Sequence, residues 1–376
     1  MKFTIESQIL TAVLTDVVKA VPAKPIEAIM MNYLLELNKE GILRVTATDG
    51  EIALRGLVKP DSVESEGTTT VPAKLFLELV KTLPAGPVTF ERDNAANAAV
   101  ISWKTGKSSM PIFDPSDFVK IAVPSKDSAK QFTVTTDILM RALGKTIFAV
   151  SHDEARPVLT GIFFDVKPEG TNLVASDASK LVVMTIPTPE VTEEASFILP
   201  AKAATILKGI LPKEQPLTVV FDNKNARFAF GSTELTTRTV VGKYPQYQSV
   251  IPTNNDNVLI AGRNELIDVL NRMKVVADRR TPLVKATMSF NTMDMTAEDL
   301  GMSTKGSEHI DCDYDGQDIA IGLKATTVTD VLSNIDAEKV QIKFMDARHA
   351  ILITPTGEGA EEEPYQAIVM PYRIEK

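Results

Sequence analysis

Two aspartates at matching places are the residues of this sequence whose type and spacing most readily suggest chemistry. Asp49 and Asp177 stand in the runs TATDG and VASDA, and a pair of carboxylates can act as general acid and base. An aspartate in a turn between two strands is more often a side chain that caps the turn. The sequence therefore favours a structural role for both, and leaves the paired-carboxylate role as the alternative.

The remaining reactive residue types do not form a known constellation. His152, His309 and His349 lie far apart and none belongs to an HExxH spacing, so we interpret them as structural. The single cysteine, Cys312, excludes an intramolecular disulfide and a CxxC-type zinc or redox site. We therefore predict no metal and no cofactor.

One short run imitates a phosphate-binding loop. Gly106-Lys107-Ser108 resembles the end of such a loop, but Ile101 stands where its first glycine is required. The chain also has no GxGxxG run and no GxSxG run. The sequence thus predicts a protein that is not an enzyme.

Composition fits an ordinary globular protein. The chain has 376 residues, of which 44% are hydrophobic and 24% charged, enough for two or three domains with their own cores. The start, MKFTIESQ, carries Glu6 where a secretory signal needs apolar residues. No apolar run approaches the about 18 residues of a membrane span. We expect a soluble, cytoplasmic protein that does not bind membranes.

An internal repeat organises the chain. VPAK at 71–74 recurs as LPAK at 199–202 and, more weakly, as IGLK at 321–324. Each of these runs leads into a helical pattern and then a strand pattern. The segment starts repeat as well, since KFTI at 2–5 matches QFTV at 131–134. A period near 125 residues is too long for a solenoid unit, so each copy is predicted to be a full domain.

Polar, turn-rich stretches mark the boundaries between the copies, which gives domains 1–124, 125–253 and 254–376. Each copy reads as a doubled βαβββ unit, with two helices packed on mainly antiparallel sheets. This order predicts an α+β fold. The predicted helices span 7–24, 72–83, 136–150, 200–213, 263–280 and 323–335.

Charge is divided unevenly between these helices and the rest of the chain. The six stretches hold 15 basic and 7 acidic residues, a net of +8, whereas the whole chain carries −9 and the remainder therefore −17. Solvated helix faces often carry such lysines, particularly near the C-terminal end. Lys74, Lys202 and Lys324 instead recur near helix starts, where a cation opposes the helix dipole. A functional reason would account for lysines at these destabilising positions. If the six helices share one surface, that surface is positively charged and attracts phosphates without reading bases.

The chain resembles the bacterial replicative sliding clamps, the beta subunits of DNA polymerase III. The resemblance runs from MKFT to VMPYR at 369–373 and includes TATDGEIAL at 46–54, TTTVPAK at 68–74 and VGKYPQYQSVIP at 241–252. It implies a head-to-tail homodimer of three-domain subunits closed into a ring around duplex DNA. It also implies tethering of the polymerase, the clamp loader and other proteins with a clamp-binding motif, without catalysis.

Three sets of candidate site residues follow. For loose, sequence-independent contact with DNA phosphates we predict Lys24, Lys74, Lys202, Lys208, Arg272, Lys274 and Lys324. For the dimer interface we predict charge complementarity between two edge strands, with apolar support from Met110: Lys104, Lys107 and Met110 against Glu298, Asp299 and Glu308. The resemblance implies a pocket for partner peptides at Arg156, Val158, Leu159, Ser176, Ala178, Lys180, Leu181, Pro245, Val250, Arg348, Ile368, Val369, Met370, Pro371, Tyr372 and Arg373.

The run after Asp177 departs from the family. A glycine, a histidine and an arginine usually follow the aspartate there, whereas this chain has Ala178, Ser179 and Lys180. Two other classes of function also stay open. One is a repeat-built scaffold that binds only proteins, and the other is an enzyme whose site escapes motif recognition.

Overall fold

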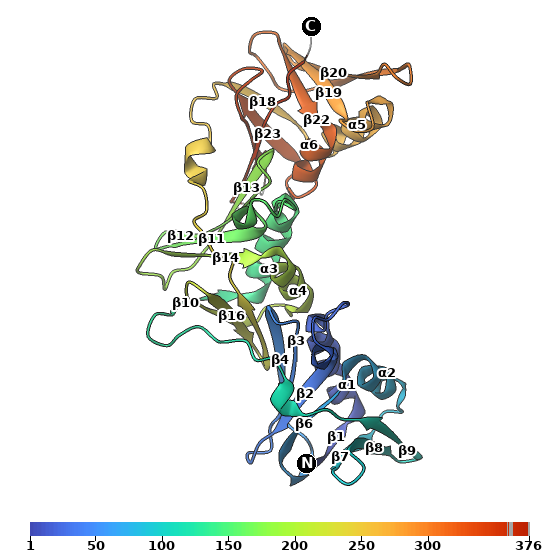
Figure 1. Ribbon diagram of the computed structural model, residues 1–376. Helices are drawn as coiled ribbons and strands as arrows, with labels where there is room; N and C mark the ends of the chain where they lie inside the picture. The colour runs from blue at the N-terminus through green and yellow to red at the C-terminus, as the bar shows by residue number, and fades with distance from the viewer. Residues whose placement is uncertain (359, 361–363, 375–376) are drawn as a thin grey trace. The chain divides into compact units, whose positions relative to one another are not determined.

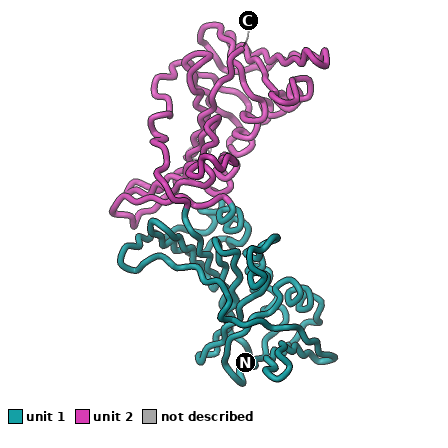
Figure 2. Tube along the Cα trace, in the orientation of Figure 1, with its two compact units in different colours: residues 1–140, 202–239 teal, residues 141–201, 240–376 magenta. Residues whose placement is uncertain are grey.

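The computed structural model describes residues 1–358, 360 and 364–374. Its chain forms two compact units, drawn in Figure 2, of which unit 1 holds residues 1–140 and 202–239 and unit 2 holds residues 141–201 and 240–376. No described helix is long and apolar enough to cross a membrane.

In the described part of the chain, six α-helices form where the repeat predicts them (Figure 1). They are α1 Ser7–Val17, α2 Ala73–Thr82, α3 Thr136–Thr146, α4 Ala201–Ile210, α5 Arg263–Val276 and α6 Ala325–Leu332. All six end earlier than expected. After α1 the chain continues only as a 3₁₀ turn, η1 (Val18–Ala20), because Val21 is already extended and Pro22 follows. After α5, the Asp278 carboxylate accepts hydrogen bonds from the backbone N–H groups of Arg280 and Thr281 and so closes a turn.

Unit 1 contains two antiparallel sheets. The five-stranded sheet has the order β5 (Ser62–Ser65), β1 (Lys2–Glu6), β7 (Pro87–Asp93), β8 (Ala98–Trp103), β9 (Gly106–Pro111). The eight-stranded sheet has the order β10 (Lys130–Thr135), β15 (Pro216–Phe221), β16 (Asn225–Phe230), β17 (Thr233–Arg238), β4 (Ile52–Val58), β3 (Leu43–Thr48), β2 (Asn32–Leu37), β6 (Gly67–Pro72). In the second sheet, β17 of the second repeat pairs with β4 of the first.

Unit 2 repeats this plan. Its eight-stranded sheet has the order β14 (Ala195–Pro200), β11 (Gly161–Lys167), β12 (Gly170–Ser176), β13 (Lys180–Ile186), β25 (Tyr365–Val369), β24 (Ile351–Thr356), β23 (Lys339–Phe344), β18 (Asn257–Gly262). Its four-stranded sheet has the order β21 (Thr304–Asp311), β20 (Thr292–Asp299), β19 (Leu283–Ser289), β22 (Ile319–Lys324). Here β13 of the second repeat pairs with β25 of the third.

Helices pack on the sheets within each unit. In unit 1, α1 packs against α2 and β4, and in unit 2, α5 packs against α6, β20 and β21 (Figure 1). The first strand of each repeat alternates exposure, so that Phe3, Phe132 and Leu259 turn into the cores. Phe3 stacks on Phe90 with ring centroids 5.2 Å apart. The predicted α+β class, with two helices per repeat on antiparallel sheets, is confirmed.

Two glycines that differ in their surroundings test the packing. A Cβ on Gly161 in β11 would lie 2.5 Å from the carbonyl oxygen of Leu199 in β14, whereas a Cβ on Gly209 in α4 meets nothing within 4 Å. We expect Gly161→Ala to lower the free energy of unfolding by about 1–3 kcal/mol, because the backbone must shift. We expect Gly209→Ala to raise it by up to about 1 kcal/mol, because alanine favours the helix. Urea unfolding of both variants checks the pair, and equal signs would contradict this packing.

Candidate functional site

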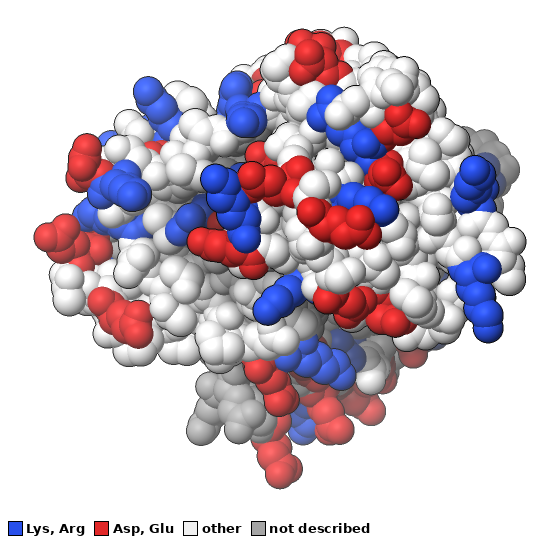
Figure 3. Space-filling model, turned by 90° about the horizontal axis from the view of Figure 1, so that it is seen from below, with Lys and Arg blue, Asp and Glu red and all other residues white. Residues whose placement is uncertain are grey.

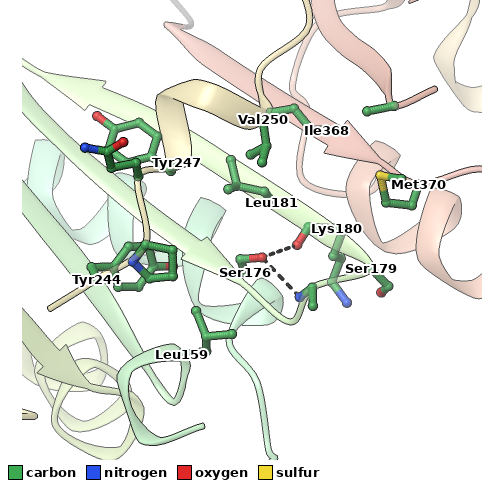
Figure 4. A pocket seen from close by; sticks show the side chains of 14 residues that line it. Leu159, Ser176, Ser179, Lys180, Leu181, Tyr244, Tyr247, Val250, Ile368 and Met370 are labelled. Carbon is green, nitrogen blue, oxygen red and sulfur yellow. Dashed lines mark hydrogen bonds between the residues drawn. The ribbon is translucent and has the colours of Figure 1, made fainter. Parts of the chain in front are cut away.

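A cavity in unit 2 is drawn in Figure 4. It has a volume of about 460 Å³ and a mostly apolar lining. The lining comes from the short helix η5 (Pro157–Leu159), the β12–β13 turn, the segment that includes η6 (Tyr247–Val250), and the chain around β24 and β25. The lining residues are Leu159, Ser176, Ala178, Ser179, Lys180, Leu181, Tyr244, Pro245, Gln246, Tyr247, Val250, Ala350, Ile368 and Met370.

The floor of this cavity is also part of the hydrophobic core. Leu159, Leu181 and Ile368 are buried in a cluster with Tyr244 and Tyr247. At the rim, Val250 is 52% exposed and Met370 42% exposed, although both are apolar. A cavity with a buried apolar floor and exposed apolar rim residues is suited to take up apolar side chains.

Two tyrosines, which sequence reasoning left out of the pocket, fix one wall. The Tyr244 ring stacks on Phe163 with centroids 4.6 Å apart. The Tyr247 hydroxyl donates to Asp165 Oδ2 at 2.6 Å, and burial raises the pKa of Tyr247. Both tyrosines stand in the VGKYPQYQSVIP run, so aromatic residues beside Pro245 were the available signal.

The β12–β13 turn holds the polar edge of the cavity in a defined shape. The Ser176 hydroxyl donates to the carbonyl oxygen of Lys180 at 2.8 Å and accepts from the Ala178 N–H at 3.1 Å (Figure 4). The Asp177 carboxylate accepts from the N–H groups of Ser179 and Lys180, and its other oxygen lies 2.7 Å from Lys180 Nζ. This arrangement makes Asp177 a turn-capping residue.

The equivalent turn in the first repeat follows the same plan. The Thr48 hydroxyl donates to the carbonyl oxygen of Ile52, and Asp49 Oδ1 accepts from the N–H groups of Glu51 and Ile52. Gly50 adopts a positive φ of 90° there, and Ala178 adopts 73° at the matching place. A positive φ strains any residue with a Cβ, so the change from the family's glycine keeps the turn at a local cost. The structural interpretation of both aspartates is confirmed.

Seven of the sixteen residues predicted for the pocket do not line this cavity. Arg156 pairs with Asp153 at 3.0 Å, and Val158 is partly buried and packs against the core cluster. Val369 is 1% exposed because neighbouring residues of a strand face opposite sides, which places Ile368 in the cavity. The Tyr372 N–H donates to the carbonyl oxygen of Gly322, so the chain after Met370 follows the third repeat instead. The remaining three are Arg348, Pro371 and Arg373.

The residues predicted to meet DNA are mostly exposed. Lys24, Lys74, Lys202, Lys208, Arg272 and Lys274 are exposed, and Lys324 is half-buried. Lys202 pairs with Asp49, and Arg272 pairs with Glu308 at 2.7 Å. Lys324 is the last residue of β22 and precedes the helix, whereas Lys74 and Lys202 are the second residues of theirs. All three lysines therefore lie at the start of the second helix of a repeat, and Lys324, the N-cap of α6, stands two places earlier than the other two.

The predicted dimer residues lie on or beside two edge strands, each within its own unit. Lys104 is in the turn that joins β8 to β9, Lys107 is in β9, and Glu298, Asp299 and Glu308 are in β20 and β21. Met110 is 4% exposed because its side chain packs inside unit 1. The expectation that Met110 supplies apolar contact to a second chain is corrected for this reason.

On the face drawn in Figure 3, basic and acidic side chains are interspersed, so this face is not a uniformly positive lining. Among the residues that the structure describes, no group of three or more His, Cys, Asp or Glu side chains is arranged to hold a metal ion.

Comparison with known proteins identifies the class to which this fold and cavity belong. Three family models match in succession, the N-terminal, central and C-terminal domains of the DNA polymerase III beta subunit, over residues 1–122, 133–246 and 248–373. The chain therefore belongs to the DNA polymerase III beta subunit family.

Individual relatives agree over the whole length. The beta sliding clamps of Escherichia coli K12 and Salmonella typhimurium are each 28% identical over 375 residues, with 100% of both chains covered. Among solved structures, the DNA polymerase III beta subunit of Thermotoga maritima superimposes with a TM-score of 0.89 at 26% identity, with both chains fully covered. A sliding clamp from Pseudomonas aeruginosa has the same fold, with a TM-score of 0.93 at 21% identity and full coverage.

The charge on Asp177 offers a pH-dependent test of the cavity edge. Burial alone would raise its pKa, but hydrogen bonds from Lys180 and Ser179 outweigh burial and lower the pKa below its ordinary 3.8. A lowered pKa in the folded state stabilises the fold above the ordinary value, and this stabilisation is lost as the pH falls through the folded-state pKa. We expect Asp177→Asn to cost about 1–2 kcal/mol at pH 7 and progressively less below pH 3.8. Urea unfolding at pH 7 and pH 3 checks this, and a pH-independent difference would exclude the ionic contribution.

Proposed function

We propose that this chain is a non-catalytic processivity clamp, in which two copies close into a ring around duplex DNA and tether the DNA polymerase. The names of its relatives, which are beta sliding clamps, support this function. The three successive family models, over 1–122, 133–246 and 248–373, support a division into three domains, for which we propose the boundaries 1–124, 125–253 and 254–376. The scaffold that binds only proteins is the alternative that the experiment below must exclude.

The strand pairing between repeats is the observation that carries the ring. At each internal junction, an edge strand of one repeat pairs with an edge strand of the repeat before it. β17 of the second repeat pairs with β4 of the first, and β25 of the third repeat pairs with β13 of the second. In the first repeat, β9 corresponds to β17 and β25, and in the third repeat, β21 corresponds to β4 and β13. Both β9 and β21 are edge strands, so each has one side without a neighbouring strand. An edge strand presents unpaired backbone N–H and C=O groups. We infer that β21 of one copy pairs with β9 of the other, in both directions, which closes a ring of two chains.

Charge complements this backbone pairing at the proposed contact. In an antiparallel pairing like that of β17 with β4, the start of one strand lies beside the end of the other. Lys107 near the start of β9 and Glu308 near the end of β21 would then lie at the same end of the junction, whereas Glu298 and Asp299 stand at its other end. Exposed ion pairs are worth less than about 1 kcal/mol each, so they favour the correct partner more than they add affinity. With Met110 buried in its own unit, most of the affinity is assigned to backbone hydrogen bonds and helix contacts beside these strands.

Exposed cations on the helices support sequence-independent contact with DNA. Lys74 on α2, Lys208 on α4 and Lys274 on α5 are exposed. Lysines bind phosphates as point charges and do not need the bidentate geometry through which arginine reads guanine. Weak contacts of this kind suit a ring that must slide along the duplex.

The unit 2 cavity is assigned to short peptides of the polymerase, the clamp loader and other partners. An extended peptide needs apolar pockets for alternate side chains and a few polar anchors. Leu181, Val250 and Met370 supply the apolar surface, and the Ser176–Lys180 turn supplies polar groups at its edge. The flexible thioether of Met370 can repack around different side chains, which suits a site shared by several partners.

Topological retention tests the ring. We expect protein loaded by a clamp loader onto nicked circular DNA to remain bound through gel filtration in high salt, and to be released when the DNA is cut once. Salt weakens phosphate contacts but does not open a closed ring. Release from circular and linear DNA at the same rate would exclude encirclement and favour the scaffold.

Charge variants in the same assay test the lining. Replacing both Lys74 and Lys208 by Glu is expected to reduce loading and to flatten the salt dependence of duplex binding by about one unit of slope for each phosphate that is no longer neutralised. Lys39→Glu is the matched control, since Lys39 is an exposed lysine in the turn between β2 and β3. Equal effects at the helices and at Lys39 would exclude the lining.

A matched pair of valines tests the cavity. Val250, 52% exposed, lines the cavity, whereas Val241, 80% exposed, does not. We expect Val250→Asp to weaken binding of a polymerase-derived clamp-binding peptide at least tenfold, because a carboxylate must be desolvated in an apolar site. We expect Val241→Asp to leave binding unchanged, as measured by calorimetry. Native affinity in the Val250 variant would show that the peptide binds elsewhere.

A further inference from the structure

At each of the two junctions between repeats, β4·β17 and β13·β25, a lysine side chain donates a hydrogen bond to a backbone carbonyl oxygen at a helix end. Beside the β4·β17 junction, Lys19 Nζ after α1 donates to the carbonyl oxygen of Gly209 in α4 at 2.8 Å. Beside the β13·β25 junction, Lys145 Nζ in α3 donates to the carbonyl oxygen of Asn334 after α6 at 2.9 Å. In both cases a cation meets the C-terminal end of a helix, where carbonyl groups lack intrahelical partners and the helix dipole is negative.

Each of these lysines is accompanied by a carboxylate. Lys19 Nζ lies 3.5 Å from Asp16, and Lys145 Nζ lies 2.8 Å from Asp336. Lys145 is the tenth residue of α3, and Lys19 lies two residues beyond the end of α1, in the 3₁₀ turn η1. Both junctions therefore draw their cation from the C-terminal end of the first helix of a repeat or from the turn that continues it.

In the third repeat, Arg272 occupies this place. It is the tenth residue counted from Arg263, the start of α5, and so corresponds to Lys145. It also has a carboxylate, since Glu308 on β21 accepts from Arg272 Nε at 2.9 Å and from Nη2 at 2.7 Å. The side chain of Arg272 is nevertheless 56% exposed, whereas that of Lys145 is 7% exposed. A guanidinium has five N–H donors, more than the Glu308 carboxylate takes.

The backbone acceptor for Arg272 can be located by the same counting of helix positions. Gly209 is the ninth residue from the start of α4, and Asn334 the tenth from the start of α6. The corresponding residues of α2 are Lys81 and Thr82, at its C-terminal end. If β21 pairs with β9 of a second copy, the helices brought together at that junction are α5 of one copy and α2 of the other.

We infer that Arg272 belongs to the interface between two copies of this chain, where it donates to the carbonyl groups at the C-terminal end of α2, and that Glu308 positions it. This inference rests on the proposed ring. It moves Arg272 from the DNA-contact set, in which the sequence analysis placed it, to the interface set. It also joins Arg272 to Glu308, a residue that the sequence analysis assigned to the interface alone.

The chain offers a close control for this assignment. Lys274 is an exposed cation of the same helix, only two residues further on. Residues two apart on a helix point to different sides. Lys274 therefore stays in the DNA-contact set. Arg272→Ala and Lys274→Ala each remove one positive charge from α5, the first from the proposed interface and the second from the proposed DNA contact.

Sedimentation equilibrium over a range of protein concentrations separates the two roles. A favourable cation at a helix C-terminus is worth about tenfold in an equilibrium constant. Both contacts of a two-chain ring break together, so Arg272→Ala is expected to raise the dimer Kd about a hundredfold. Lys274→Ala is expected to leave the dimer Kd unchanged and to lower the salt slope of DNA binding by about one. Glu308→Gln should weaken the dimer in the same direction as Arg272→Ala, but less.

Two contrary results are distinguishable. A wild-type chain that is monomeric at every concentration would overturn the proposed ring itself. A wild-type dimer whose Kd is the same in Arg272→Ala and in Lys274→Ala would overturn only the assignment of Arg272. Circular dichroism of each variant confirms that α5 is intact, so that a shift in Kd reports the interface.

Discussion

The pairing of backbone groups between neighbouring repeats is the interaction on which the rest of this structure depends. Each repeat builds two sheets, of four strands each except for the five strands of β5-β1-β7-β8-β9. These sheets would end in open edges, and an open edge leaves a row of donors and acceptors without partners. The β4·β17 and β13·β25 pairs each cover two such edges and join two four-stranded sheets into one eight-stranded sheet. Because this pairing uses the backbone, it constrains side chains little, and repeats whose sequences have diverged widely can still join in the same way.

The helices use the space that this pairing defines. Ala73, Ala201 and Ala325 each begin the second helix of a repeat and are half-buried or buried, so a small residue fits where the chain leaves a strand and turns across the sheet. The lysine that follows in two repeats opposes the helix dipole, and Lys202 relieves part of this cost through Asp49. The stability of these helices therefore does not account for the two lysines, which is why they belong to the DNA contacts proposed above.

The sequence predicted what depends on local pattern and period. Six helices, antiparallel strands and two capped turns follow from alternating apolar residues and from the positions of Asp49 and Asp177. It did not predict what depends on orientation within an element. Ile368 and Val369 were equally plausible pocket residues, and only the strand's alternation places one in the cavity and the other in the core. Met110 and Tyr372 were misplaced because burial and the path of a chain end are set by distant residues, which no local pattern reports.

The cavity in unit 2 illustrates how such a fold obtains a binding site without a dedicated element. Its floor residues, Leu159, Leu181 and Ile368, belong to the core cluster, so folding already fixes their positions. A site of this kind loses little conformational entropy on binding, because the groups that meet the ligand are ordered beforehand. The same economy restricts its variation, since a change on the floor alters stability as well as binding. Changes that alter binding without altering the stability of the fold are therefore expected at the exposed rim, where Val250 and Met370 lie.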